Sequence, residues 1–598
     1  MSTRPPLPRS ITAAPRDPVW LAFDAVDIRS VQRWLESDVD FGELVVSSHP
    51  AVDTHEAYYD TDDWRLHRAG LTLCLREAGG RVHASLSPAP KPGPGEVIDP
   101  PDRDHHNQET TGPVGLPTTS HPSIATQDVT SVDVTLLRKT DGQVARRLVL
   151  LIGASPLVRC VTLRVVTRAF QLSEGATPVA RVWLRRVDIP LADDQPPAHL
   201  DRVEIESTSG DSPAFAEVVD TLCRVFGLRP ATTSRFSASL HALGRSVPEP
   251  PDLGATTLEP SAAIGELVMV VLRRQFAKVR AHEPGTRLGD DPEELHDMRV
   301  AIRRMRVAFK LFAAYLPARA LPLRDELKWA GDVLGEVRDR DVQIEGVTAI
   351  GRDFNPAERH ALAGLAGPLE EQRRVARRRL IRALDSKRFS RLVDRLTATL
   401  VRGPLRSDPS HRLPTRAVAP QLIERCYTRV VRHARRVKKS SPPEQFHRLR
   451  IRFKILRYAL EFHREIYGKA TDDVIRAIAD LQQILGAHQD ADVATSWLER
   501  TVRSQGRRLS PETLFVAGKV SERYARRAQR LRRRFPPAYA QLRRRNWKRL
   551  LRRLETLRAA SVLSPALERR VLPNPAAVEA DPQTGTGAVV VDFRSRRG

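Results

Sequence analysis

An internal repeat in the second half of the chain constrains the fold more than any other feature of the sequence. Basic residues recur at a constant offset of 151: His296, Arg299, Arg303 and Arg306 match His447, Arg450, Lys454 and Arg457. Further pairs keep the same offset: Arg274 and Lys278 match Arg425 and Arg429, and Leu334-Gly335 matches Leu485-Gly486. A gapless register of chemically matched positions indicates a duplicated unit.

Each copy has the spacing of an amphipathic helix. At about 100° per residue, His296, Arg299, Arg303, Arg306 and Lys310 fall on one arc of a helix, which we call the first basic stripe. Apolar residues from Met298 to Phe312 fall on another arc. His447, Arg450, Lys454 and Arg457 form the second basic stripe in the same way. A solvated basic face is the simplest explanation, but the recurrence of unmatched charge at identical spacing favours a binding face.

Aspartates follow the Leu-Gly pair in both copies. They are Asp339 and Asp341 in the first copy, and Asp490 and Asp492 in the second. Glycine is typical of a helix C-cap and aspartate of an N-cap, so we expect a turn between two helices here. The alternative is that these aspartates hold arginines of the basic stripes in position.

The composition divides the chain into two different modules. Residues 1–250 hold 26 basic and 32 acidic side chains, and residues 251–598 hold 71 and 40. Short alternating apolar runs predict a strand-rich domain over 1–243, interrupted by a polar loop or insertion over 88–127. A proline-rich linker is expected at 244–260, helical repeats at 261–402 and 417–560, a second linker at 403–416, and a loose tail at 571–598.

Charge, hydropathy and cysteine content narrow the function. The excess of basic residues in the second module should attract a polyanion. The longest apolar run, Leu267–Leu272, is too short to span a membrane, and Met1–Arg16 lacks the pattern of a secretion signal. The four cysteines lie far apart, which excludes a zinc ribbon or a disulfide scaffold and fits the cytoplasm.

The repeated segments resemble the signatures of the CHAD domain, the conserved histidine α-helical domain. They are His296–Phe312, Leu334–Val342, His447–Phe462 and Leu485–Val493. The resemblance covers about residues 258–560 and implies two pseudo-repeated four-helix bundles around a basic pocket that binds inorganic polyphosphate. It assigns polyphosphate contacts to both basic stripes and, through the repeat, to Arg274, Lys278, Arg425 and Arg429. Asp339, Asp341, Asp490 and Asp492 would support them.

The first module is similar, in degenerate form, to the CYTH domain, whose enzymes are antiparallel β tunnels that process triphosphates with a divalent metal. The similarity is carried by Tyr58–Glu77, Val203–Ser207 and Ser234–Phe236. It implies vestigial triphosphate contacts at Arg76 and Arg235, and Mg²⁺ or Mn²⁺ ligands at Glu204 and Glu206. The opening glutamate pair of the signature is missing, so we expect no efficient catalysis. Glu204 and Glu206 could equally be ordinary strand residues.

Together these features predict an antiparallel, barrel-like α+β domain followed by an all-α domain. The leading function is polyphosphate binding without a required cofactor, in the cytoplasm and at polyphosphate granules. One alternative is a metal-dependent triphosphatase or polyphosphatase in the first module. Another is non-specific binding of nucleic acid, for which aromatic residues are few among the cations. His296 and His447 could also be ordinary core histidines.

Overall fold

The computed structural model describes residues 20–37, 44–88, 125–129, 133–191, 195–208, 212–352, 354–405 and 407–559. The chain divides into two compact units, Met1–Pro250 and Pro251–Gly598, and each is described by itself. Most of the segment 88–127 expected to be a loop and all of the tail 571–598 lie outside the described residues. Pro88 ends one strand, however, and residues 125–127 lie in the next.

The first unit is built on an antiparallel sheet with the strand order β10-β1-β9-β8-β7-β3-β4-β5-β6, and β2 pairs with β7. The strands are β1 (Trp20–Asp24), β2 (Leu44–Ser48), β3 (Val52–Asp60), β4 (Leu71–Ala78), β5 (Arg81–Pro88), β6 (Ala125–Val129), β7 (Val158–Glu174), β8 (Thr177–Ile189), β9 (Ala198–Ser207) and β10 (Arg229–Pro230). The helices are α1 (Ile28–Glu36), α2 (Arg65–Arg68), α3 (Val134–Leu137), α4 (Gln143–Ile152), α5 (Pro213–Phe226) and α6 (Arg235–Ala242).

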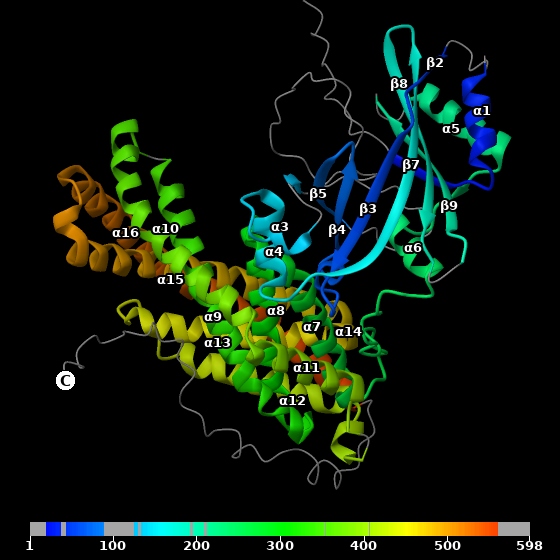
Figure 1. The fold of residues 1–598 in the computed structure, drawn as a ribbon. Coiled ribbons are helices and arrows are strands. Elements are labelled where there is room, and N and C mark those ends of the chain that lie inside the picture. The colour runs from blue at the N-terminus through cyan, green and yellow to red at the C-terminus, as the bar shows by residue number, and fades with distance from the viewer. Residues whose placement is uncertain are drawn as a thin grey trace, which may run out of the picture. The chain divides into compact units, whose positions relative to one another are not determined.

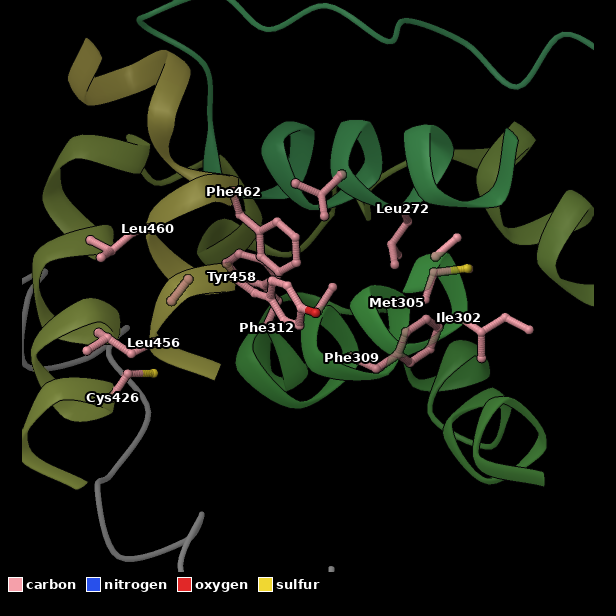
Figure 2. Packing of buried hydrophobic residues seen from close by; sticks show 14 of the residues in the cluster. Leu272, Ile302, Met305, Phe309, Phe312, Cys426, Leu456, Tyr458, Leu460 and Phe462 are labelled. Atoms are coloured by element: carbon pink, nitrogen blue, oxygen red, sulfur yellow. The ribbon is translucent and has the colours of Figure 1, made fainter. Parts of the chain in front are cut away.

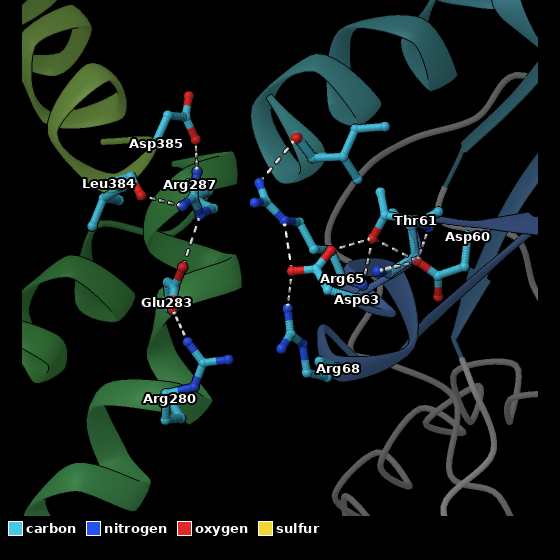
Figure 3. Close-up of polar contacts among 12 residues, drawn as sticks. Asp60, Thr61, Asp63, Arg65, Arg68, Arg280, Glu283, Arg287, Leu384 and Asp385 are labelled. Atoms are coloured by element: carbon cyan, nitrogen blue, oxygen red, sulfur yellow. Dashed lines mark hydrogen bonds and ion pairs between the residues drawn. The ribbon is translucent and has the colours of Figure 1, made fainter. Parts of the chain in front are cut away.

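A carboxylate organises the connection between β3 and β4. Asp60 accepts backbone N–H groups of Thr61 at 2.7 Å, Leu66 at 2.9 Å and His67 at 2.8 Å. Figure 3 shows this cluster together with Asp63, which contacts Arg65 and Arg68. The bonds from Leu66 and His67 satisfy free N–H groups at the start of α2, and the bond from Thr61 holds the turn before it, after which β4 pairs with β3.

The second unit is helical and repeats the same series of helices. The first copy contains α7 (Ile264–Leu288), α8 (Pro292–Leu311), α9 (Leu323–Gly351) and α10 (Pro356–Leu384), followed by α11 (Lys387–Arg402). The second contains α12 (Thr415–Ala434), α13 (Pro443–Phe462), the short α14 (Arg464–Tyr467), α15 (Asp472–Gln505) and α16 (Pro511–Gln541), followed by α17 (Trp547–Ala559). The first and last residues of α13 lie 151 positions after those of α8, and the first residue of α12 lies 151 positions after that of α7.

One hydrophobic core joins the two copies. Leu272 of α7, Met305 and Phe309 of α8, Cys426 of α12 and Leu456 of α13 all belong to it, and Figure 2 shows them with their neighbours. A second cluster, which includes Leu365 and Trp497, packs α9, α10, α15 and α16 together where these helices extend beyond the others (Figure 1). An antiparallel β domain followed by an all-helical region confirms the fold class expected from the sequence.

A buried arginine anchors the end of α7. Arg287 donates from Nε to Glu283 at 3.1 Å, from Nη1 to Asp385 at 2.6 Å and from Nη2 to the carbonyl oxygen of Leu384 at 3.0 Å (Figure 3). This arrangement ties the end of α10 to α7. No helix among the described residues has both the length and the apolar character needed to cross a membrane.

The prediction of a turn between two helices after each Leu-Gly pair is wrong. Gly335 and Asp339 lie inside α9, and Gly486 and Asp490 lie inside α15. Neither glycine has a positive φ, so neither ends a helix as a C-cap would. The long helices continue because their apolar residues on both sides of the glycine pack into the shared core.

Candidate functional site

The two basic stripes meet where α8 packs beside α13. Arg303 of α8 donates from Nε to the hydroxyl of Tyr458 of α13 at 3.0 Å. Arg304 contacts Glu461 of α13 at 2.7 Å. The repeat therefore brings both stripes to one place, although they are separated by about 150 residues in the sequence.

Lys454 lies among arginines from both helices. Burial, together with the positive charges of Arg303, Arg450, Arg299 and Arg457, lowers the pKa of Lys454 to about 6. Because two of these arginines are on α8 and two on α13, Lys454 marks the centre of the site. We call Arg299, Arg303, Arg450, Lys454 and Arg457 the convergent basic cluster.

The aspartates of the repeat face this cluster. Arg299 lies 3.7 Å from Asp339, and the negative charge of Asp490 acts on Arg450. Burial is the main cause that lowers the pKa of both arginines and raises the pKa of Asp490. These contacts favour the positioning role for the two aspartates over the capping role.

The glycines of the repeat lie under the same arginines. A Cβ atom on Gly335 would lie 3.6 Å from Nε of Arg299, and one on Gly486 would lie 3.5 Å from an Nη atom of Arg450. Each guanidinium thus lies against bare helix backbone. A Cβ atom would make ordinary van der Waals contact here, whereas a side chain larger than alanine would occupy the place of the guanidinium.

The two histidines occupy matching positions at one end of the stripes. Burial lowers the pKa of His296, as does the charge of Arg338. Burial and the charge of Arg450 lower the pKa of His447. His447 Nδ1 lies 3.0 Å from Oε1 of Gln489, and its buried Nε2 has no hydrogen-bond partner among the described residues. Both histidines are therefore mostly neutral near pH 7, and His447 presents one unused ring nitrogen.

Positive charge exceeds negative charge at this site. The carboxylates that contact or act on its arginines are Asp332 (on Arg306, at 3.7 Å), Asp339, Asp490 and Glu461, which Arg304 and Arg457 share. Within the described residues, these four carboxylates stand against six arginines of α8 and α13. The arginines are Arg299, Arg303, Arg304, Arg306, Arg450 and Arg457. Half-buried cations in excess favour an anionic ligand.

The remaining basic residues expected at the site lie elsewhere in the unit. Arg274 is paired with Glu465 and donates from Nε to the carbonyl oxygen of Thr256 at 2.5 Å. Lys278 is exposed on α7. The charges of Lys310, Arg425 and Arg429 act on the thiol of Cys426, whereas the largest charge effects on Lys454 come from Arg303, Arg450, Arg299 and Arg457.

The outer aspartates of the repeat have separate environments. Asp341 is buried and accepts from Nε of Arg373 on α10 at 2.6 Å, so it joins α9 to α10. Burial raises the pKa of Asp492, with a further contribution from Glu444. Neither residue contacts the convergent basic cluster through a hydrogen bond or ion pair that the structure shows.

Tyr458 is a site residue that the sequence did not indicate. Its ring is fully buried, and the guanidinium carbons of Arg303, Arg304 and Arg457 lie 6.0, 5.1 and 5.5 Å from its centre. Cation–π attraction and the hydroxyl bond to Arg303 fix these arginines. The sequence feature that could have indicated Tyr458 is a difference between the two copies, since Tyr458 stands where the first copy has Val307.

The first unit contains a buried ion network of its own. Glu56 contacts Arg76 at 2.6 Å and Arg235 at 3.5 Å, and Glu204 contacts Arg185 at 2.8 Å and Arg235 at 3.6 Å. All five side chains are buried. Glu56 and Arg185 were not expected here from the sequence, because they come from strands far apart in the chain.

This network does not fit a metal site. Both oxygens of Glu204 face arginines. Burial raises the pKa of Glu204, but the charges of Arg185 and Arg235 outweigh burial, so the pKa is lowered. Glu206 is half-buried, and burial raises its pKa. Among the described residues no three His, Cys, Asp or Glu side chains gather in a way that could hold a metal ion. Arg76 and Arg235 are likewise already paired with Glu56.

Comparisons with known proteins find one family match within the second unit. The family described as CHAD domain matches residues 270–499. The CHAD domain from the plant Ricinus communis is 28% identical, with 48% of this chain and 96% of that chain covered and a TM-score of 0.40. PptA from Streptomyces chartreusis is 21% identical, with 47% and 100% covered and a TM-score of 0.39.

A solved structure also resembles part of the chain at lower similarity. It is a Hippeastrum protein described as an adenylyl cyclase with a dominant triphosphatase activity, 16% identical, with 39% of this chain and 98% of that chain covered and a TM-score of 0.26. A comparison with curated protein sequences found no match.

Proposed function

Residues 270–499 form a CHAD domain, and we propose that it binds inorganic polyphosphate at the convergent basic cluster. The observation that carries the proposal is the position of Lys454 among four arginines contributed by two helices. Without an anion, these half-buried like charges repel one another and destabilise the site. A ligand with several negative charges would remove that cost.

The shape of the charge distribution favours a polymer over a single phosphate. Each stripe places a cation every three or four residues, which corresponds to about 5 Å along a helix. A linear chain of phosphates can contact successive cations along such a row. Arginine is suited to this role because its fork of N–H donors matches phosphate oxygens.

Binding at this site requires no cofactor. A triphosphatase or polyphosphatase in the first unit is the weaker alternative, since Glu204 is already paired with Arg185 and Arg235. Mg²⁺ or Mn²⁺ would enter only if that alternative held. Non-specific nucleic-acid binding is the other alternative. We further expect the protein in the cytoplasm at polyphosphate granules, which imaging of the tagged protein with a polyphosphate stain would test.

Titration of the full-length protein with polyphosphate, tripolyphosphate and single-stranded DNA tests the proposal. We expect polyphosphate to bind most tightly and to displace DNA at a lower phosphate concentration. The double variant Arg303→Gln plus Lys454→Gln should lose most of the affinity. The matched control, Arg530→Gln plus Arg533→Gln on α16, removes two exposed cations and should change it little. Equal losses in both variants would indicate diffuse attraction instead of a site.

A further inference from the structure

A second group of cations lies on the last turns of α12, directly after α12 at Arg436, and on the other side of α13. We call Arg429, Arg432, His433, Arg436, Arg448 and Arg452 the α12–α13 basic face. Arg448 and Arg452 are one helical turn apart and point about 120° and about 160° away from Lys454 around α13. Among the described residues, the charges that act most strongly on His433 are those of Arg452, Arg436 and Arg448, and all three are positive. Burial and the charge of Arg429 lower the pKa of Arg452. The residues thus form one cluster across two helices.

The first copy of the repeat provides an internal comparison for this face. His282 is the counterpart of His433, and it lies 2.9 Å from Glu294 and 3.8 Å from Asp297. In the second copy these two carboxylates are replaced by Gln445 and Arg448.

A third replacement also makes the second copy more positive, because Arg452 stands where the first copy has Ala301. The same helix pair therefore folds with carboxylates around its histidine in one copy and with cations in the other. Packing does not require the cations of the second copy, so binding of an anion is the simpler reason for them.

We propose that the α12–α13 basic face is a second binding surface for polyphosphate, engaged by chains long enough to extend beyond the convergent basic cluster. The proposal rests on the proposed function. Lys310 connects the two places, because it is the last residue of the first basic stripe and acts on Cys426 together with Arg429 and Arg452. A polymer that runs along the first stripe to Lys310 reaches the neighbourhood of this face.

The face fits a phosphate polymer better than nucleic acid. Tyr427 is the aromatic residue of α12, and its ring is stacked on Trp547 with 3.6 Å between ring centres. That ring surface is already covered. Single-stranded nucleic acid usually gains affinity from bases stacked on aromatic rings, and the six residues of the face include none except the histidine.

Two linked surfaces have a consequence for chain length. Once one part of a long chain is bound at the cluster, its free part is held near the second surface at a high effective concentration. The two surfaces lie on different sides of α13, so we expect a ligand of three phosphates to occupy one of them at a time. Loss of the face should therefore weaken the binding of long chains and leave that of tripolyphosphate unchanged.

The repeat itself supplies the variant for the test. Arg448→Asp plus Arg452→Ala gives α13 the residues that the first copy has in α8, so the helix should fold. Arg530→Asp plus Arg533→Ala on α16 is the matched control for charge. We expect the first variant to bind long-chain polyphosphate about tenfold more weakly, with a salt dependence of log K shallower by about 1.4 for two lost phosphate contacts. Tripolyphosphate affinity should stay within about twofold.

Each result has a defined meaning. An unchanged affinity for long chains, or an equal loss for long chains and tripolyphosphate, would overturn the second surface. A variant that loses DNA binding and retains long-chain polyphosphate binding would identify a nucleic-acid surface instead. If the unaltered protein binds no polyphosphate, the proposed function itself fails. The milder Arg452→Gln variant, checked by circular dichroism, repeats the test if the double variant does not fold.

Discussion

Lys454 should make polyphosphate binding depend on pH. In the free protein its pKa is about 6, so the amine is mostly neutral above pH 7. The charged groups that face it are Arg299 and Arg303 on α8, Arg450 and Arg457 on α13, and Asp490 on α15. Bound phosphates would raise the pKa of Lys454 toward its ordinary value of about 10.4. The complex would then hold one more proton than the free protein between these two values.

The size of this shift sets the magnitude of the effect. Affinity should rise as the pH falls toward 6, by up to about tenfold per pH unit, because one pKa unit corresponds to about 1.4 kcal/mol. Charging Lys454 at pH 8 costs roughly 3 kcal/mol when its pKa is about 6. Binding should also take up close to one proton at that pH.

The assay compares the unaltered protein with Lys454→Arg, whose guanidinium stays charged throughout. Calorimetric titrations between pH 7 and pH 9 in two buffers of different ionisation enthalpy give affinity and proton uptake. Above pH 7 the two histidines of the site contribute little, because burial lowers the pKa of both. The arginine variant should show almost no pH dependence there, and the titration of the ligand itself cancels in the comparison. Equal pH slopes and equal proton uptake in the two proteins would refute the reasoning.

Three further predictions concern stability and the supporting residues. The lowered pKa of Lys454 means that the unfolded chain binds more protons between about pH 6 and pH 10.4. The free energy of unfolding should therefore rise with pH in that window, and Lys454→Gln should show a higher melting temperature at pH 7 with a weaker pH trend. Gly486→Ala should stabilise α15 by up to about 1 kcal/mol in denaturant unfolding and preserve binding, whereas Gly486→Leu should displace Arg450 and weaken it. Glu56→Gln should destabilise the first unit by about 3–5 kcal/mol, because it removes the negative charge that pairs with buried Arg76 and leaves Glu204 as the carboxylate beside Arg235. The same substitution should leave polyphosphate affinity unchanged, and a loss of affinity would contradict the separation of the two units.

The sequence predicted the helices that carry the site because their information is local. The alternation of basic and apolar residues between His296 and Phe312 defines the exposed and buried sides of α8 without any tertiary contact. The offset of 151 then predicts α13, whose ends match those of α8 through that offset.

The same sequence could not predict the backbone after each Leu-Gly pair. Glycine and aspartate are typical of helix caps. The neighbouring residues in the sequence do not reveal that here they lie inside a helix beside an arginine. Only the packing of Arg299 over Gly335, near Asp339, distinguishes the two. The contacts of Arg425 and Arg429 were also inaccessible, because the repeat relates positions in the chain and not the neighbours that each copy acquires. The buried network of Glu56 and Arg185 depends on sheet order in the same way.

The central claim is that cations of α8 and α13 form one site for a phosphate polymer. The most direct measurement is the salt dependence of polyphosphate affinity for the unaltered protein, for Arg303→Gln plus Lys454→Gln, and for the control Arg530→Gln plus Arg533→Gln. We expect the slope of log K against log salt to become shallower by about 1 to 1.5 in the first variant, together with a large loss of affinity. The control should differ little from the unaltered protein. The same loss of slope and affinity in both variants would contradict a formed site and reduce the basic stripes to part of a general positive surface.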